Sequence, residues 1–264
     1  MGWSVAEARA CVARGAVYVK GRRKLDADKA ILAGTTLSVV LEEGGQAWNA
    51  PQPSAPAALV VIAEDGAVLV VAKPPGQLTQ PSPGRVGHSL LDAARDYLKS
   101  EPGLVHRLDK DTSGLVIFGK TPAATTALAA EFKEGRAQKT YLAAVHGELP
   151  ESGTFDGPLA KDRSHPGKYR VVAHGGGVPA LTDFTRLGHN GRTSTVALHP
   201  KTGRTHQLRV HLSHAGHPIL GDALYGGSDA VRCLLHAWKL SILGATYEAP
   251  VPEDLAAFVT PFLR

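Results

Sequence analysis

The stretch HRLDKDTSGL, residues 106–115, places four charged side chains directly before an apolar run. The small residues 112–114 predict a turn, and the apolar residues 115–118 predict a buried strand after it. A carboxylate on such a turn is positioned by a rigid element, which suits a catalytic or binding group. The charges at the start of this strand therefore make Asp109 and Asp111 candidate functional residues.

Calcium binding and glycosidic bond cleavage also use closely spaced acidic residues. The order Asp109-x-Asp111-x-Ser113-Gly114 resembles half of a calcium loop, but its twelfth position is Lys120. A calcium loop needs a bidentate glutamate there, so the calcium hypothesis fails. A carboxylate pair for glycosidic bond cleavage needs a defined separation, which spacing in a turn does not predict. On this stretch alone, a solvated charged turn is the simplest alternative to a functional site.

The composition indicates a globular protein with a sizeable core. The chain has 264 residues, of which 43% are apolar, enough for one large domain or a main domain with a small appendage. Its two cysteines, Cys11 and Cys233, lie far apart and indicate a reducing compartment. We find no signal peptide and no membrane-spanning run, so we expect a cytoplasmic protein without a membrane partner. The net charge of +5 is compatible with a nucleic-acid partner but does not require one.

The sequence predicts two folded segments and a linker. Residues 1–45 form a small module with a helix over Val5–Arg14 and short strands. Residues 46–58 are rich in Gly, Pro and Ala, which predicts a linker. Residues 59–264 form the main domain. Its predicted strands arrive as hairpins rather than alternating with helices, so we expect an α+β fold with a mixed or antiparallel sheet.

Several local signals define elements of the main domain. We expect a hairpin around residues 64–66, a helix opened by the capping box Ser89–Asp92 and reaching Lys99, a helix capped by Thr121, and strands over 140–145 and 193–198.

The stretch HPKTGRTHQLRVHLSHAGHPILGDALYGG, residues 199–227, is the second informative one. Thr205 is the predicted N-cap of a helix that runs to Ala215, with Gly216 at its end. Helical spacing gives it a buried face, made of Leu208, His211, Leu212 and Ala215.

Arginines and histidines on this helix suggest two kinds of ligand. Arg204 and Arg209, with the amides of the helix N-terminus, suit a phosphate or a buried carboxylate. A metal is the second possibility, because four histidines occur, but no Cys or acidic residue accompanies them at ligand spacing. We therefore expect no metal and expect packed or hydrogen-bonded histidines, namely His206, His211, His214 and His217.

Together the two stretches resemble the RNA pseudouridine synthases of the RluA type. The similarity covers roughly Val60 to Ile242. One matching motif would be weak, but several occur in order with family-like separations. These motifs are Lys73–Gly76, His106–Leu115, Lys139–Ala143, Gly203–Leu212 with His217–Gly226, and Leu235–Trp238.

The resemblance implies a fold and a catalytic set. The family fold is a mixed-sheet core with a central cleft, and residues 5–41 resemble a shortened RNA-binding module of a small-subunit ribosomal protein. Asp109 would be the catalytic aspartate and Tyr141 would stack on the target uracil. Arg209 would pair with Asp109 and keep its carboxylate ionised.

The resemblance also implies substrate-binding residues. Arg107 would hold the nucleotide out of the RNA stack, and the segment Arg204-Thr205-His206 would line the same cleft. His106 and Lys73 belong to the matching motifs and complete the expected substrate-binding set.

The implied reaction fits these residue types. It breaks the bond between uracil nitrogen and ribose, rotates the base and rejoins it through carbon, without redox chemistry, metal or nucleotide cofactor. It needs a carboxylate held against a cation, a closed pocket and an aromatic face for the extruded base. The sequence does not decide whether Asp109 acts first as nucleophile or as base.

We therefore expect a monomeric RNA pseudouridine synthase that needs no cofactor. Ribosomal RNA of the large subunit is favoured over transfer RNA because an N-terminal module is present. Two alternatives differ in their products. A nucleoside or glycoside hydrolase would admit water and release free base, whereas a non-catalytic RNA-binding or assembly factor would not depend on Asp109.

Overall fold

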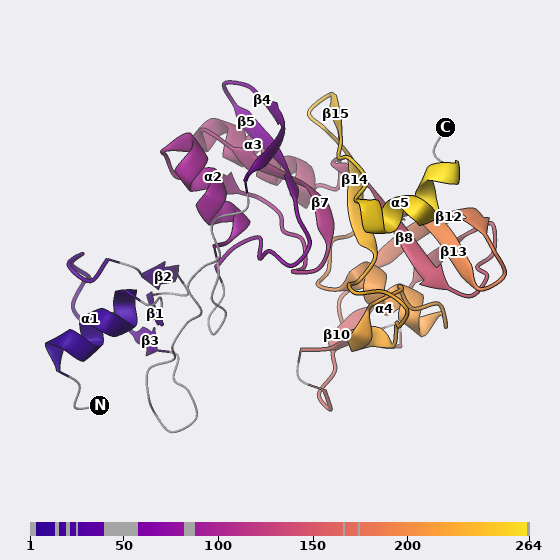
Figure 1. Ribbon diagram of the computed structural model, residues 1–264, viewed down its shortest axis with the longest axis horizontal. Coiled ribbons are helices and arrows are strands. Elements are labelled where there is room, and N and C mark those ends of the chain that lie inside the picture. The colour runs from indigo at the N-terminus through magenta and orange to yellow at the C-terminus, as the bar shows by residue number, and fades with distance from the viewer. Residues whose placement is uncertain are drawn as a thin grey trace. The chain divides into compact units, whose positions relative to one another are not determined.

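The computed structural model describes residues 4–13, 16–19, 22–24, 26–39, 58–81, 88–165, 167–173 and 175–262. The chain divides into two compact units. The first contains Met1–Leu59 and Gln77–Pro102, and the second contains Val60–Gly76 and Gly103–Arg264. Figure 1 labels their elements. Within the described ranges, no helix has the length and apolar character needed to cross a membrane.

The N-terminal part of the first unit is a helix with a small sheet. Its helix packs through Cys11 against Ala16 and Val17. The sheet is antiparallel in the order β2-β1-β3. The predicted helix and strands are confirmed here, but Arg14, Gly15 and residues 40–57, which include almost all of the predicted linker, lie outside the described residues. The elements are α1 (Val5–Ala13), β1 (Val17–Val19), β2 (Arg22–Lys24) and β3 (Leu37–Val39).

Helix α2 (Leu90–Leu98) begins at the predicted capping box. The Ser89 hydroxyl accepts a hydrogen bond from the Asp92 amide at 3.2 Å, and the Asp92 carboxylate accepts one from the Ser89 amide at 3.1 Å. The two bonds satisfy amide donors that the first helical turn leaves without partners. The helix ends at Lys99, whose backbone is left-handed with φ of 56°.

The second unit is built on a mixed sheet, which has ten strands among the described residues. The main path runs β4-β5-β7-β14-β8-β13-β12-β9, with β15 paired to β14 and β6 to β7. Strands β7 and β14 are parallel, and the other described pairs are antiparallel. The predicted α+β class with a mixed sheet is confirmed. The strands are β4 (Val60–Glu64), β5 (Val68–Lys73), β6 (Gly103–Leu104), β7 (Ser113–Gly119), β8 (Gln138–His146), β9 (Ser152–Asp156), β12 (Leu181–His189), β13 (Thr193–Pro200), β14 (Leu235–Ile242) and β15 (Ala245–Glu248).

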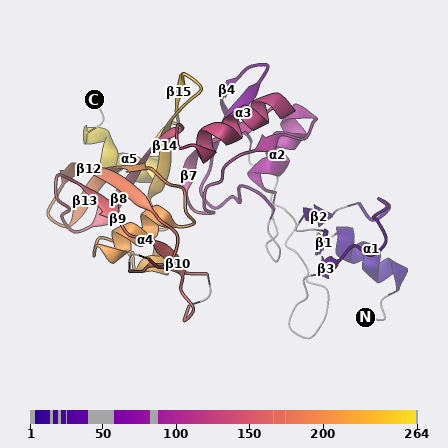
Figure 2. The ribbon, with the colours of Figure 1, turned by 180° about the vertical axis from the view of Figure 1, so that it is seen from behind.

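Helices cover this sheet, and a separate hairpin projects beside α4 (Figures 1 and 2). Helix α3 contacts β6 and β7, α5 contacts β8, and α4 contacts β11 of the hairpin. One apolar core lies around β8 and β13, and a second lies around β5, β7 and α3. The elements are α3 (Pro122–Lys133), β10 (Leu159–Lys161), β11 (Tyr169–Val171), α4 (Gln207–His214), η1 (Ala223–Tyr225), α5 (Glu253–Val259) and η2 (Thr260–Phe262).

The junction of β7, β14 and β8 positions the stretch HRLDKDTSGL. Ala237 of β14 pairs with Gly114 of β7 on one side and with Tyr141 of β8 on the other. Gly114 has φ of 113°, and a Cβ at this position would lie 2.2 Å from the carbonyl oxygen of Ala237. Glycine is required at this approach, which brings the turn before β7 close to β8.

Candidate active site

Asp109 begins a tight turn that leads into β7. The Thr112 amide donates to the Asp109 carbonyl at 3.2 Å and closes the turn. Two basic side chains donate hydrogen bonds to peptide carbonyls of this turn. Lys73 Nζ donates to the Lys110 carbonyl at 2.8 Å, and Arg232 Nη1 donates to the Asp111 carbonyl at 3.4 Å. These hydrogen bonds fix the backbone of the turn. The Asp109 side chain itself remains 20% exposed.

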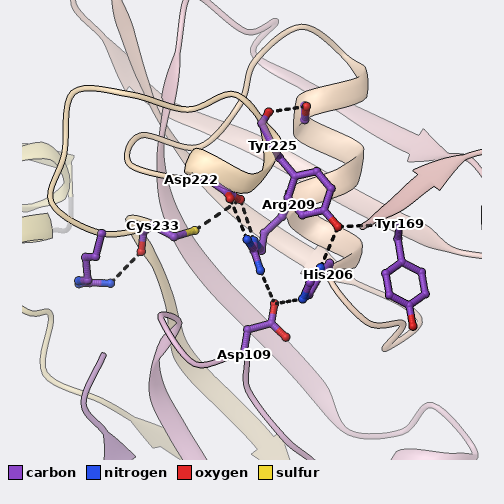
Figure 3. A network of polar contacts seen from close by, with 9 residues as sticks. Asp109, Tyr169, His206, Arg209, Asp222, Tyr225 and Cys233 are labelled. Carbon is purple, nitrogen blue, oxygen red and sulfur yellow. Dashed lines mark hydrogen bonds and ion pairs between the residues drawn. The ribbon is translucent and has the colours of Figure 1, made fainter. Parts of the chain in front are cut away.

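Arg209 of α4 holds the Asp109 carboxylate. Its Nη1 lies 3.2 Å from Asp109 Oδ2, and its Nε and Nη2 donate to the two carboxylate oxygens of Asp222 at 2.7 and 2.8 Å (Figure 3). Burial opposes the charge of Arg209, but the hydrogen bonds and charge of Asp222 raise its pKa above the ordinary value. The paired arrangement keeps Arg209 cationic and aims it at Asp109.

His206 lies on the other side of Asp109. Its Nε2 is 3.8 Å from Asp109 Oδ2, and its Nδ1 is 2.8 Å from the Tyr225 hydroxyl. Burial lowers the pKa of His206, although the charge of Asp109 acts in the opposite direction. The imidazole is therefore neutral at pH 7.

The start of α4 differs from the prediction. The helix begins at Gln207, and its N-cap is His206 with a left-handed backbone, so the prediction that Thr205 caps the helix is wrong. The reason is that the Gln207 side chain reaches back and accepts hydrogen bonds from the Arg204 amide at 3.0 Å and the Thr202 hydroxyl at 2.7 Å. These contacts fold the preceding residues into a turn of their own.

The predicted buried face of α4 is largely confirmed. Leu208, His211 and Leu212 are buried, and Gly216 follows the helix with φ of 84°. Ala215 is exposed as the C-cap, so its predicted burial is wrong.

An open pocket brings most of the expected site residues together. The turn supplies Arg107 and Asp109, β8 supplies Tyr141, and the segment at the start of α4 supplies Arg204, His206 and Arg209. Burial, followed by the negative charge of Asp109, raises the pKa of Tyr141. Its hydroxyl therefore stays protonated at neutral pH.

Three expected substrate-binding residues do not line this pocket. Lys73 is 1% exposed beneath the turn, and burial lowers its pKa to about 7. His106 accepts a hydrogen bond from the Ile117 amide at 3.0 Å and stacks on Phe132, and burial lowers its pKa to about 3. Thr205 is exposed and outside the pocket lining. Lys73 therefore supports the turn, and His106 packs in the core.

The structure also shows site residues that sequence reasoning missed. Lys139 lines the pocket, and burial lowers its pKa. Asp222 and Tyr225 lie behind Arg209 and His206 (Figure 3). Both belong to the stretch GDALYG, residues 221–226, which carried part of the resemblance but received no role. Asp222 is the acidic residue between Leu220 and Leu224, and its apolar surroundings could have predicted a buried carboxylate.

Three of the four histidines, His206, His211 and His217, have hydrogen-bond partners, whereas His214 is exposed, so its predicted packing is wrong. His211 contacts the Thr182 hydroxyl at 3.1 Å and the Gly157 carbonyl at 3.0 Å. His217 contacts the His146 carbonyl at 2.9 Å. In the described part of the chain, no group of three or more His, Cys, Asp or Glu side chains is arranged to hold a metal ion.

Comparisons with known proteins agree with this geometry. A family model described as RNA pseudouridylate synthase matches residues 67–214, more than half of the chain. Ribosomal large subunit pseudouridine synthase D of Nitrosomonas europaea is 35% identical over 223 residues, which cover 76% of this chain and 64% of that protein. The protein of the same name from Borreliella burgdorferi is 37% identical over 199 residues, which cover 70% of this chain and 61% of that protein. The chain thus spans less than two thirds of the length of either relative.

A solved structure supports the same assignment. Human RNA pseudouridylate synthase domain containing 1 superposes with a TM-score of 0.66 at 28% identity, covering 80% of this chain and 90% of that one. The matched family model, the relatives and the shared fold agree with the motifs around Asp109 and Arg209. The chain belongs to the RluA-type family of RNA pseudouridine synthases.

Proposed function

We propose that this protein isomerises uridine to pseudouridine in RNA, with Asp109 as the catalytic carboxylate. The observation that carries the proposal is the Asp109–Arg209 pair, 3.2 Å apart, in a pocket that Tyr141 and Arg107 also line. A carboxylate held against a fixed cation is the group that this reaction requires.

The residues of the pocket can be given roles in this chemistry. The reaction breaks the bond between N1 of uracil and C1′ of ribose, forms a bond between C5 and C1′, releases the C5 proton to solvent and leaves N1 protonated in its place. Substrate and product are isomers, so the reaction needs no co-reactant. Asp109 acts as nucleophile or base, and Tyr141 offers its ring to the freed uracil. The apolar side chains of Leu108, Leu208 and Leu235 also line the pocket and limit access of water.

Cations around the pocket support RNA as the substrate. Arg107, Arg204 and Lys139 line it. Arg107 is exposed and lies two residues before Asp109, so it suits an extruded nucleotide or its phosphate. The hairpin β10–β11 carries further exposed cations, Lys161, Arg163 and Arg170, which suit the RNA backbone.

We propose large-subunit ribosomal RNA as the substrate class, in preference to transfer RNA. The printed names of both bacterial relatives point to the large ribosomal subunit. In this proposal residues 1–45 form an RNA-binding module, residues 46–58 a linker and residues 59–264 the catalytic domain. We also propose that the enzyme acts as a monomer.

Tritium release provides the test. RNA labelled at C5 of uridine, separated into transfer and ribosomal fractions, is incubated with the wild type, with Asp109→Asn and with the control Asp183→Asn. Asp183 is a partly exposed carboxylate that pairs with Lys201 at 3.1 Å. We expect release from ribosomal RNA by the wild type and the control but not by Asp109→Asn. Release of free uracil would refute isomerisation, and equal turnover by Asp109→Asn would refute the role of Asp109.

A further inference from the structure

Tyr225, in the short helix η1, contacts both groups that face Asp109. Its side chain is buried, and its hydroxyl lies 2.8 Å from Nδ1 of His206. The guanidinium carbon of Arg209 lies 5.0 Å from the centre of its ring. His206 and Arg209 approach the same Asp109 oxygen, Oδ2, from separate directions (Figure 3).

The hydroxyl of Tyr225 has a defined hydrogen-bond direction. The backbone amide of Tyr169, in β11, donates to the Tyr225 oxygen at 3.0 Å. This amide has only a proton to offer, so the Tyr225 oxygen must be its acceptor. Among the described residues, the other hydrogen-bond partner of this hydroxyl is His206 Nδ1. Among the described residues, the Tyr225 proton has a hydrogen-bond acceptor only when it points at Nδ1, so this arrangement satisfies both the phenol and the imidazole.

This direction determines the tautomer of His206. A neutral imidazole carries one N–H, and Nδ1 is occupied as an acceptor. The proton of His206 is therefore on Nε2, the nitrogen that lies 3.8 Å from Asp109 Oδ2. The opposite tautomer would direct a lone pair at the carboxylate, which is repulsive.

The ring of Tyr225 supports the same arrangement. Its face lies under the Arg209 guanidinium, and its edge meets the His206 ring with centroids 5.6 Å apart and planes at 84°. Tyr169 packs edge-on against His206 from the hairpin side, with centroids 5.8 Å apart. His206 is thus packed between two tyrosine rings, and the Tyr225 hydroxyl is its hydrogen-bond partner.

We propose that Tyr225 is a positioning residue for the reaction: its hydroxyl holds His206 as the Nε2–H tautomer, which donates to the Asp109 carboxylate when RNA occupies the pocket. The separation of 3.8 Å is that of the free enzyme, and hydrogen bonds of this kind shorten in the substrate complex. The inference rests on the proposed function and extends it to Tyr225, which is not part of the pocket lining. Arg209 and His206 then share the task of holding one carboxylate oxygen.

A double-mutant cycle tests this chain of contacts. Tyr225→Phe, His206→Ala and the double variant are compared with the wild type for kcat, KM and RNA affinity in the tritium assay. Loss of one neutral hydrogen bond predicts about tenfold lower kcat for Tyr225→Phe, with KM and RNA affinity unchanged. Because the hydroxyl acts through His206, the double variant should be no slower than His206→Ala alone.

Two further variants separate positioning from folding. Tyr247→Phe removes a phenol oxygen from β15 and should keep wild-type kcat. Tyr225→Leu also removes the ring beneath Arg209, so it should be slower than Tyr225→Phe even in the His206→Ala background. Independent effects of Tyr225→Phe and His206→Ala, or wild-type kcat in Tyr225→Phe, would overturn the inference while leaving the proposed function intact.

The tautomer can be measured without turnover. Proton–nitrogen correlation spectra of the free enzyme, assigned with His206→Ala, should show a protonated Nε2 and an unprotonated Nδ1 for His206. A protonated Nδ1 would overturn the inference whatever the activity. An inactive wild type with the expected tautomer would instead refute only the proposed function.

Discussion

Replacing Asp222 by asparagine removes half of the support of Arg209. The Asp222 carboxylate is 1% exposed and accepts from Arg209 Nε and Nη2 at 2.7 and 2.8 Å. Asparagine keeps one acceptor oxygen and turns an NH₂ group toward a guanidinium N–H. One charge-assisted hydrogen bond is therefore lost, which costs about 1.5–3 kcal/mol in a buried site. The free energy of unfolding should fall by that amount.

The same substitution should slow the reaction. Arg209 would be free to turn away from Asp109, and loss of about 1.4 kcal/mol in the transition state corresponds to about tenfold in kcat. Urea unfolding and tritium release measure the two effects. Asp183→Asn is the control, because its pair with Lys201 is solvent-exposed and is worth about 0–1 kcal/mol. Wild-type stability and kcat in Asp222→Asn would show that Asp222 does not hold Arg209.

Three further predictions concern the turn, its support and a helix cap. Asp109→Asn should abolish tritium release while RNA affinity, measured by filter binding, stays within about twofold; residual turnover near wild type would contradict its role. Burial lowers the pKa of Lys73 to about 7. Between pH 7 and the ordinary pKa of lysine, the folded state therefore binds fewer protons at this side chain than the unfolded state does. The free energy of unfolding consequently rises with pH in this window. Relative to Lys73→Met, urea unfolding of the wild type should therefore show stability that increases by up to about 1.4 kcal/mol per pH unit; parallel pH profiles would contradict this. Ser89→Ala breaks the capping box of α2 and should cost about 1 kcal/mol in the same assay, whereas an unchanged midpoint would show that the cap contributes nothing.

Local signals in the sequence predicted several elements, but they gave no position for β9, β12, β14, β15 or α5. Ser89 and Thr121 cap helices as predicted, because a capping side chain bonds an amide within three residues and needs no distant partner. The hairpin β4–β5 and strands β8 and β13 also agree with the predicted positions. The start of α4 was predicted wrongly. The Gln207 side chain accepts a hydrogen bond from the Arg204 amide, and the helix begins at Gln207 with His206 and not Thr205 as its N-cap. Residue spacing does not show which side chain bonds to the preceding backbone.

The sequence predicted the contact between Asp109 and Arg209 but not the residues that support Arg209 and His206. The resemblance paired Asp109 with Arg209, which are far apart in the chain and 3.2 Å apart in the structure. The sequence did not predict the contacts of Asp222 and Tyr225. A pattern of residue types does not show which carboxylate will pair with an arginine, or which hydroxyl with a histidine. That pairing depends on how η1 packs against α4.

The sequence by itself determined the class of fold, the capped helices and the residue types that the chemistry needs, because alternation, capping and turn formation act over a few residues. Only the tertiary structure decided which charged groups meet. The parallel contact of β7 with β14 brings the Asp109 turn toward β8 and its Tyr141. The same packing buries Lys73 beneath that turn and leaves Arg107 exposed at the pocket. The burial of a side chain depends on neighbours that are distant in the chain. It is therefore decided when the strands pair, and the local sequence does not show it.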